Sequence, residues 1–520
     1  MAAHSHQSIF LGVELFAADL CAVMFVAQGE RHTLLNELAT RPAPPPRNTA
    51  YLTLSTMNAS ATDFQDHFNR RAFSVLLIGL LAYYALWLLC FWPGVLGLDS
   101  LGILKEVEDP VVNQSGKTVF WYFFVRFFYS LAQRVEYPIA VQLILGILVF
   151  ARILTWQWSQ QLHKIFVVSL VLVAMTPHMV FFLGTLYPDG IFSVAATGLM
   201  FELWLAARQR QLSRLGTMMI ALTLPLAVFA RANGIIFLLP IFATLFFVPR
   251  RSRWILASIA TLWIGLNVWG TQTHTSGHTH GAVFPLVIFE TVNFLQPRPM
   301  NLWTAEPRVA PRTVEILTNH RPLSQILAYY DRDYWDTLIF SPDGPRLLDI
   351  SRSDQRKLVH DFFRYNLWHN MPDFISSRTH VFLVSALAQG GFPGLDSAEK
   401  ILPLIKSNSA FRPFPLPTAQ AVMRQAYEFS FSHRWILWSP LPGVLLLLGL
   451  LWRAIGQRNR PLLLLSVPLA LQLGGIVFFS IAGEYRYVMP FFTLLPVLLS
   501  AWELSRRETA PATQLNSELD

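Results

Sequence analysis

The chain has 520 residues, of which 53% are hydrophobic and only 14% are charged, and its mean hydropathy is +0.40. Soluble domains carry about 25% charged residues, so this composition excludes an ordinary soluble protein. Two cysteines, Cys21 and Cys90, cannot build a disulfide framework and form no zinc-binding spacing. The net charge of +8 would suit nucleic acid, but the positions of the basic residues, described below, argue for another interpretation.

Residues 1–71 differ from the rest of the chain. Residues 8–28 are fairly apolar but contain Glu14 and Asp19, and a proline-rich stretch, RPAPPPR, follows at 41–47. A cleavable signal peptide has a basic segment before its apolar core and a small-residue cleavage site after it, and neither is clear here. We interpret 1–71 as a weakly ordered N-terminal extension, or as the product of a mis-assigned start that precedes the true one at Met57.

Apolar windows of about 20 residues recur from residue 72 onward, each long enough to cross a hydrocarbon core of ~30 Å. They predict an α-helical polytopic membrane protein with about 10 transmembrane helices. A transmembrane module at 72–271 is followed by a mostly helical external domain at 272–434, a second transmembrane module at 435–505 and a cytoplasmic tail at 506–520. The predicted spans are 72–92, 137–156, 164–184, 190–207, 216–230, 234–249, 254–271, 435–452, 461–481 and 488–504.

The basic residues alternate from loop to loop, which predicts the orientation of the chain. Cytoplasmic loops carry an excess of lysine and arginine, so the loops rich in these residues are assigned to the cytoplasm. They do not form one aromatic-interleaved patch, and nucleic-acid binding is therefore not expected. The residues in question are Arg70, Arg71, Lys164, Arg208, Arg210, Arg214, Arg250, Arg251, Arg253, Arg453, Arg458, Arg460, Arg506 and Arg507.

The first external loop, residues 93–136, contains two apolar segments that are expected to be helices at the membrane surface. LDSLGILKEVED has apolar residues at helical spacing with charges opposite them. TVFWYFFVRFFYSLAQRV is aromatic and is flanked by Lys117 and Arg134. The alternative, a further membrane span, would invert every later loop and place the arginines outside.

This topology brings several ionisable residues to one face of the membrane. Asp99 lies in the first external loop, Asp189 in the YPDG turn, Arg231 in the RANG turn, and Glu484 and Arg486 in GEYRY at the end of the ninth predicted span. Ionisable groups at membrane depth are functional candidates because each costs several kcal/mol unless it is paired or hydrated. Each also has a simpler structural interpretation, as a helix cap, a turn residue, a snorkelling arginine or an ion pair.

Together these residues suit chemistry on a phosphate. A guanidinium group binds phosphate oxygens in a planar fork, and a carboxylate within hydrogen-bond reach of a hydroxyl can act as a general base. Charge that develops on a departing phosphate would be stabilised by the arginines. The set predicts displacement of a phosphate leaving group at an outward-facing pocket.

The order of these motifs, PGVLGLDS, YPDG, RANG and EYRYVMP, resembles the GT-C superfamily of polytopic glycosyltransferases. It is most similar to the family 39 transferases and their lipopolysaccharide- and protein-modifying relatives. The resemblance covers residues 72–505 and implies a polyprenyl-phosphate-linked sugar donor, an extracytoplasmic acceptor (lipid, glycan or protein), and inversion at the anomeric carbon. It implies a bacterial inner membrane, with the active site on the periplasmic side.

By position in the motifs, the resemblance implies specific roles. Asp99 and Asp189 would be catalytic and Arg231 and Arg486 would bind the donor phosphate, supported by Asn233, Glu484 and Tyr487. Many members carry a second acid beside the first-loop aspartate, where this chain has Ser100. The acids that might replace it are Glu106, Glu108 and Asp109.

A metal ion is not expected in this site, although a divalent metal cofactor stays open. His274, His278 and His280 cluster in THTSGHTHG, and three imidazoles can bind a transition metal ion. No carboxylate is adjacent in sequence and the spacing fits no zinc signature, which favours a polar loop. In the external domain, YYDRDYWD (329–336) suits either contact with a sugar or an ordinary amphipathic helix.

Two other functions stay open. A polysaccharide polymerase or ligase that uses lipid-linked oligosaccharide would share the outward-facing arginines and the large external loop. A transporter or flippase would be expected to show internal repeats and mid-span breaks. No repeat is evident between the halves, and the charges lie at the ends of spans.

Overall fold

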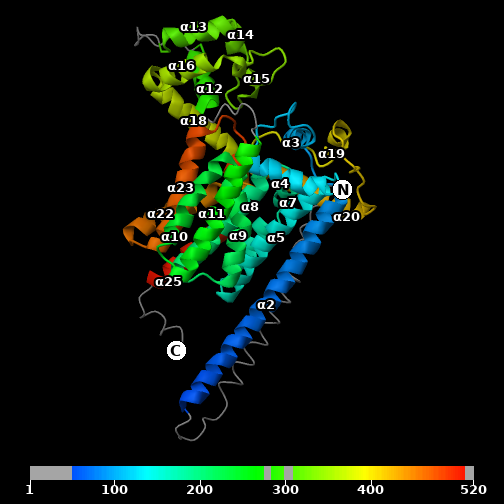
Figure 1. Ribbon diagram of the computed structural model, residues 1–520, viewed down its shortest axis with the longest axis vertical. Helices are drawn as coiled ribbons and strands as arrows, with labels where there is room; N and C mark the ends of the chain where they lie inside the picture. Colours follow the sequence, from blue (N-terminus) through cyan, green and yellow to red (C-terminus); the bar gives the residue numbers. More distant parts are fainter. Residues whose placement is uncertain (1–49, 275–282, 298–307, 510–520) are drawn as a thin grey trace.

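The computed structural model describes residues 50–274, 283–297 and 308–509, and side chains from Arg70 onward. These residues form helices and no named strand; one isolated antiparallel bridge joins Tyr334 to Ala482. A bundle of long helices carries a smaller helical region at one end, and α2 (Ala50–Cys90) projects beyond the bundle at the other (Figure 1). Of the predicted N-terminal extension, residues 1–49 lie outside the described part, whereas the chain is already helical from Ala50.

Seven helices of the described residues are long and apolar enough to cross a membrane, or eight if one bent pair counts as a span. The protein is therefore helical and membrane-embedded, but the predicted count of about ten is not confirmed. Five of these spans are α2, α5, α8, α11 and α23, and the other two are formed by α21 with α22 and by α24 with α25. The helices are α5 (Glu136–Ser159), α8 (Pro188–Gln209), α11 (Arg250–Thr273), α21 (Arg434–Leu437), α22 (Leu441–Gly456), α23 (Arg460–Phe479), α24 (Tyr485–Thr493) and α25 (Leu495–Thr509).

Three predicted spans, 164–184, 216–230 and 234–249, do not form a single helix long enough to cross a membrane, and the structure shows why. The chain bends by 54° between the segments His163–Ala174 and Pro177–Leu183, where a π-helix meets a proline that cannot donate a helical hydrogen bond. Predicted spans 216–230 and 234–249 are short because the RANG turn separates their helices. The helices concerned are α6 (His163–Ser169), η1 (Leu170–Ala174), α7 (Pro177–Leu183), α9 (Arg214–Phe229), η2 (Ala232–Phe237) and α10 (Leu238–Thr244).

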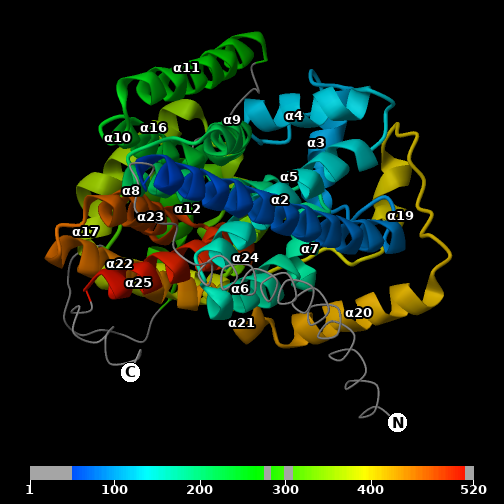
Figure 2. The same ribbon diagram turned by 90° about the horizontal axis from the view of Figure 1, so that it is seen from below.

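Helix α8 is the centre of the bundle. Its whole apolar window is buried, and it packs against α5, α9, α23 and α24. Glycines allow this close approach: a Cβ on Gly198 would lie 2.9 Å from a methyl group of Val149. By contrast, α11 is mostly exposed and lies at the edge of the bundle (Figure 2). The buried position of α8 fixes Asp189, which lies in its first turn.

The predicted first external loop, 93–136, contains two helices, α3 (Leu98–Glu108) and α4 (Val119–Ser130), in the predicted segments. With 12 residues, α4 is about 18 Å long, which is too short to cross the hydrocarbon core. Their location at a membrane surface is not shown and stays a prediction. The Thr118 hydroxyl donates a hydrogen bond to the carbonyl oxygen of Ala230 at 3.1 Å, which ties this loop to the RANG turn.

The region predicted as one external domain, 272–434, divides into two parts. Its first part has a core of its own, which includes Phe284, Leu317 and Phe362. Residues from Ala388 to Tyr427 contribute instead to the core of the bundle, and α20 packs on α2 and α7. The helices are α12 (Val283–Leu295), α13 (Pro311–His320), α14 (Leu323–Ala328), α15 (Asp336–Ile339), η3 (Leu347–Asp349), α16 (Arg352–Asp361), η4 (Phe362–Asn366), α17 (Leu367–His369), α18 (Met371–Ala386), α19 (Ala398–Ile401), η5 (Leu402–Leu404) and α20 (Pro417–Ser432).

The close packing of α8 predicts opposite effects for two glycine substitutions. In Gly190→Ala the new methyl group would meet the backbone of Phe182 on α7, whereas Gly265 on α11 has no atom within 4 Å of an added Cβ. We expect G190A to lower the free energy of unfolding by roughly 1–3 kcal/mol, and G265A to leave it unchanged or raise it by up to about 1 kcal/mol. Denaturation of the detergent-solubilised variants measures both. Equal stability of the two variants would contradict the assigned packing.

Candidate functional site

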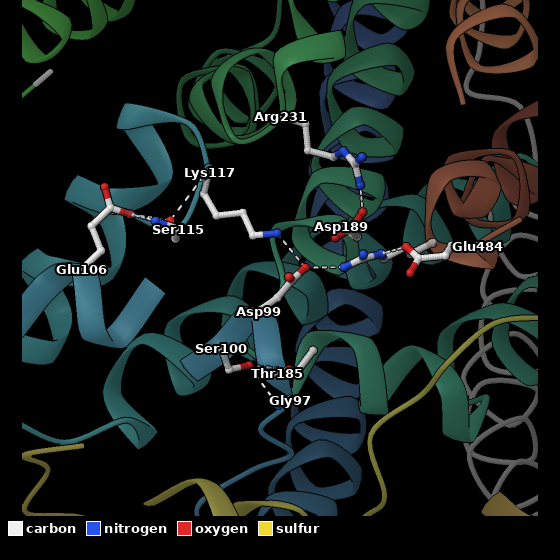
Figure 3. Close-up of polar contacts among 11 residues, drawn as sticks. Gly97, Asp99, Ser100, Glu106, Ser115, Lys117, Thr185, Asp189, Arg231 and Glu484 are labelled. Carbon is white, nitrogen blue, oxygen red and sulfur yellow. Dashed lines mark hydrogen bonds and ion pairs between the residues drawn. The ribbon is translucent and has the colours of Figure 1, made fainter. Parts of the chain in front are cut away.

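Asp99 lies in the first turn of α3, at the end of the bundle that carries the smaller helical region. The turn before it requires Gly94, whose φ of +125° lies in the region that glycine favours, and whose neighbour Val95 donates a hydrogen bond to Gly184. The Asp99 carboxylate accepts a contact from Lys117 Nζ at 2.6 Å, and Lys117 reaches it from the loop between α3 and α4 (Figure 3). The first loop therefore supplies an acid and a cation that contact each other.

Arg486 connects Asp99 to the last predicted motif. Its Nη1 donates to Asp99 and its Nε donates to Glu484, which precedes α24. The guanidinium group also lies over the rings of Tyr187, at 5.3 Å, and Tyr487, at 5.5 Å. Because the two carboxylates and two rings surround it, Arg486 is held in one orientation.

Asp189 and Arg231 form the second ion pair of the site. Asp189 is almost fully buried at the start of α8. Arg231 begins the RANG turn, whose Gly234 is needed because a Cβ there would lie 2.5 Å from the carbonyl oxygen of Ala227. The Arg231 guanidinium lies 4.9 Å from the centre of the Tyr487 ring, which thus contacts both arginines of the site.

These six charged residues form what we call the paired cluster. Three carboxylates and three cations compensate one another, and their side chains are mostly shielded from solvent. The structure thus brings together Asp99, Asp189, Arg231, Glu484 and Arg486, the five charged residues predicted to share one face, and their chemical roles stay predictions. Asn233 is not joined to them: its Oδ1 has no hydrogen-bond partner among the described residues. The members are Asp99, Lys117, Asp189, Arg231, Glu484 and Arg486.

The cations set the charge of Asp99. Burial by itself raises the pKa of this carboxyl group, but attraction and hydrogen bonds from Lys117 and Arg486 outweigh it and hold the pKa well below its ordinary value. Burial lowers the pKa of Lys117, against the opposing effect of Asp99. Asp99 is therefore ionised at neutral pH, and it is a weak base as long as both cations hold it.

The other acids of the first loop do not join the paired cluster. Ser100, which occupies the position next to Asp99, is buried and its hydroxyl lies 3.2 Å from that of Thr185. Glu106 accepts hydrogen bonds from Ser115 and contacts the imidazole of His274 at 3.0 Å.

The carboxylate of Glu108 accepts hydrogen bonds from the Tyr129 hydroxyl and the Lys406 backbone. The carboxylate of Asp109 accepts hydrogen bonds from the backbone at Val111 and Val112. None of these three acids contacts Asp99.

A cavity of about 580 Å³ adjoins the paired cluster between α4, α9 and α11. Lys117 and Arg231 contribute its cationic part, and Val119, Val228 and Phe229 are among its apolar residues. Helix α11, which closes one side, is mostly exposed and so faces the surroundings of the bundle. A ligand with an anionic group and an apolar tail matches this distribution.

Sequence reasoning missed two residues of this site. Lys117 was assigned only to the flank of an interfacial helix, and Tyr187 was not singled out. The available signals were weak: Lys117 is a lone lysine after Gly116, and Tyr187 begins the YPDG motif. Neither feature of the sequence predicts that Lys117 contacts Asp99 or that the Tyr187 ring lies under Arg486.

No group of three or more His, Cys, Asp and Glu side chains within the described residues is arranged to hold a metal ion. His274 is used in another way, stacked on the Tyr122 ring with centroids 3.8 Å apart. His278 and His280 lie outside the described residues, so the predicted histidine cluster is not tested.

Comparison with known proteins identifies no relative. No family model, curated protein or solved structure matches the chain.

The pairing of Asp99 predicts a pH-dependent contribution to stability. Because its pKa is depressed in the folded state, this contribution is complete above the unfolded-state pKa of about 3.9 and is lost as pH falls below it. We expect Asp99→Asn to lower the free energy of unfolding at pH 7 by roughly 1–3 kcal/mol, and the difference from wild type to shrink below about pH 4. Thermal unfolding across this pH range measures it.

Asp109→Asn is the matched control, because Asp109 is exposed and contacts only nearby backbone groups. A D99N variant as stable as D109N at neutral pH would show that the ion pairs of Asp99 contribute nothing.

Proposed function

We propose that the protein is a membrane glycosyltransferase that moves a sugar from a polyprenyl-phosphate-linked donor to an acceptor outside the cytoplasm. One observation carries the proposal: three cations and an ionised carboxylate meet beside a cavity that is cationic at one part and mainly apolar elsewhere. Such a cavity suits a lipid phosphate. The resemblance of the motifs to the GT-C superfamily supports the same assignment.

In this proposal the donor phosphate takes over the partners of Asp99. Lys117 and Arg486 hold the Asp99 carboxylate in the structure. A phosphate that enters beside them offers several oxygens to the same cations, and an arginine fork favours that geometry. The cations then shift toward the phosphate, and the pKa of Asp99 rises as its counter-charges leave. Donor binding would thus convert a weak base into a stronger one.

The chemical step is then a single displacement. Asp99 accepts the proton of an acceptor hydroxyl, the hydroxyl oxygen forms a bond to the anomeric carbon, and the bond from that carbon to the phosphate oxygen breaks. The electron pair of the broken bond stays on the phosphate, where Lys117, Arg231 and Arg486 stabilise it. Attack on the side opposite the phosphate inverts the anomeric carbon. Asp189 keeps Arg231 in place through their ion pair.

Profiling of the cell envelope tests the proposed reaction. We expect deletion of the gene to remove a sugar from surface glycans or lipopolysaccharide, and D99N to fail to restore it, because loss of a general base lowers the rate by about 10²–10⁴-fold. Asp109→Asn should restore the sugar. Mass spectrometry of the extracted glycans measures the result. Full restoration by D99N would remove Asp99 as the base, and an unchanged glycan profile with altered solute uptake would favour a transporter.

Binding of the lipid carrier is tested apart from catalysis. We expect a polyprenyl monophosphate to raise the Tm of the purified protein, since a ligand that binds only the folded state stabilises it. Arg231→Gln should reduce this rise, because Arg231 lines the cavity. Arg126→Gln is the control, since Arg126 is exposed on α4 and contacts Tyr122. An equal rise in both variants would contradict a role for Arg231 in phosphate binding.

A further inference from the structure

A second and larger cavity lies at the opposite end of the bundle from the paired cluster. Its volume is about 640 Å³, and it is lined by residues of α8, α25, the connection between α10 and α11, and the start of α23. Helix α8 joins the two ends: Asp189 lies in its first turn and Arg208 in its last. Its 22 residues separate them by about 30 Å, so the two cavities are different sites.

Four arginines from two separate segments, the end of α8 and the start of α23, line this cavity, namely Arg208, Arg210, Arg458 and Arg460. Arg208 pairs with Glu508 at 2.9 Å and lies over the Trp204 ring at 5.9 Å. Within the described part of the chain, the side chains of the other three make no ion pair or hydrogen bond. The cavity therefore holds four cationic groups and a single carboxylate.

Most of the remaining lining residues are apolar and lie where membrane-spanning helices end, and Asn459 and Ser505 are polar. The apolar residues include Trp204, Phe247 and Leu462, and also Phe246, whose side chain is 84% exposed. A highly exposed phenylalanine at the end of a bundle suits contact with lipid chains. The cavity thus has a cationic part next to a mainly apolar part at the ends of membrane-spanning helices.

The excess of basic residues in cytoplasmic loops does not by itself explain why four arginines line one cavity. A positive-inside bias needs basic residues somewhere in the loops at this end, and Arg214 and Arg251 meet that need without lining the cavity. The four cavity arginines come from segments about 250 residues apart in the chain and nevertheless surround one space.

We propose that this cavity binds the phosphate-bearing headgroup of an anionic phospholipid. The guanidinium groups of Arg210, Arg458 and Arg460 would bind the phosphate oxygens, and the acyl chains would leave along the apolar side past Phe246. Basic pockets between membrane helices bind headgroups in this way. The proposal is independent of the function assigned to the paired cluster.

The test uses variants that preserve the backbone. Arg210 and Arg458 have φ values of 53° and 51°, a region that glycine adopts more readily than arginine. R210G/R458G therefore removes two cations without straining the backbone of the two turns. The control is R214Q/R251Q, which removes the same charge from the same end of the bundle but outside the cavity.

Purified full-length protein is mixed with micelles that contain phosphatidylglycerol, phosphatidylcholine or no phospholipid, and separately with inorganic pyrophosphate. We expect phosphatidylglycerol, and not phosphatidylcholine, to raise the Tm of wild type by roughly 2 °C or more. Native mass spectrometry should show the lipid retained on the protein. Both effects should persist in R214Q/R251Q and be lost in R210G/R458G.

Three results would overturn the proposal. Equal retention by both double variants would assign the effect to general surface charge. Equal stabilisation by phosphatidylcholine would remove the requirement for an anionic headgroup. Stabilisation by pyrophosphate without any by phosphatidylglycerol would identify a soluble phosphate as the ligand instead of a lipid.

Discussion

Mutual compensation of charge at one end of the bundle is the interaction on which the site depends. An isolated charge that is withdrawn from water costs several kcal/mol, and removing one member of a buried pair leaves the other uncompensated. In the paired cluster each carboxylate has at least one cationic partner, and Asp99 has two. The arrangement is therefore stable only when the first loop, the start of α8, the RANG turn and the start of α24 are all in place.

The same compensation connects ligand binding to reactivity. Lys117 and Arg486 are the groups that keep Asp99 ionised and weakly basic, and they are also the groups that a phosphate would attract. A ligand that competes for these cations changes the basicity of the carboxylate without any new acid or base. The smaller helical region contributes to this geometry, since Gly483, next to Glu484, donates a hydrogen bond to the carbonyl oxygen of Asp333 at 2.8 Å.

Helix α8 relates the two ends of the molecule. It is buried along its apolar window, and it carries an acid of the paired cluster in its first turn and a cation of the second cavity in its last. A buried helix that packs on six neighbouring helices resists displacement along its axis. Helix α8 therefore holds the paired cluster and the second cavity at a fixed separation. The mostly exposed α11 lies at the edge of the bundle and borders the cavity beside the paired cluster.

The sequence by itself determined the helical, membrane-embedded class, because apolar windows and the shortage of charge are local properties that any membrane imposes. It also marked Asp99, Asp189, Arg231, Glu484 and Arg486 as candidates, since charged residues at the ends of apolar runs stand out. Only the tertiary structure decided their pairing. Lys117, and not Glu106, is a neighbour of Asp99. This depends on the direction in which the ten-residue loop between α3 and α4 folds, and the spacing of apolar residues does not encode that direction. The number of full spans was likewise not readable, because a bent helix and two short helices at a turn are as apolar as a complete span.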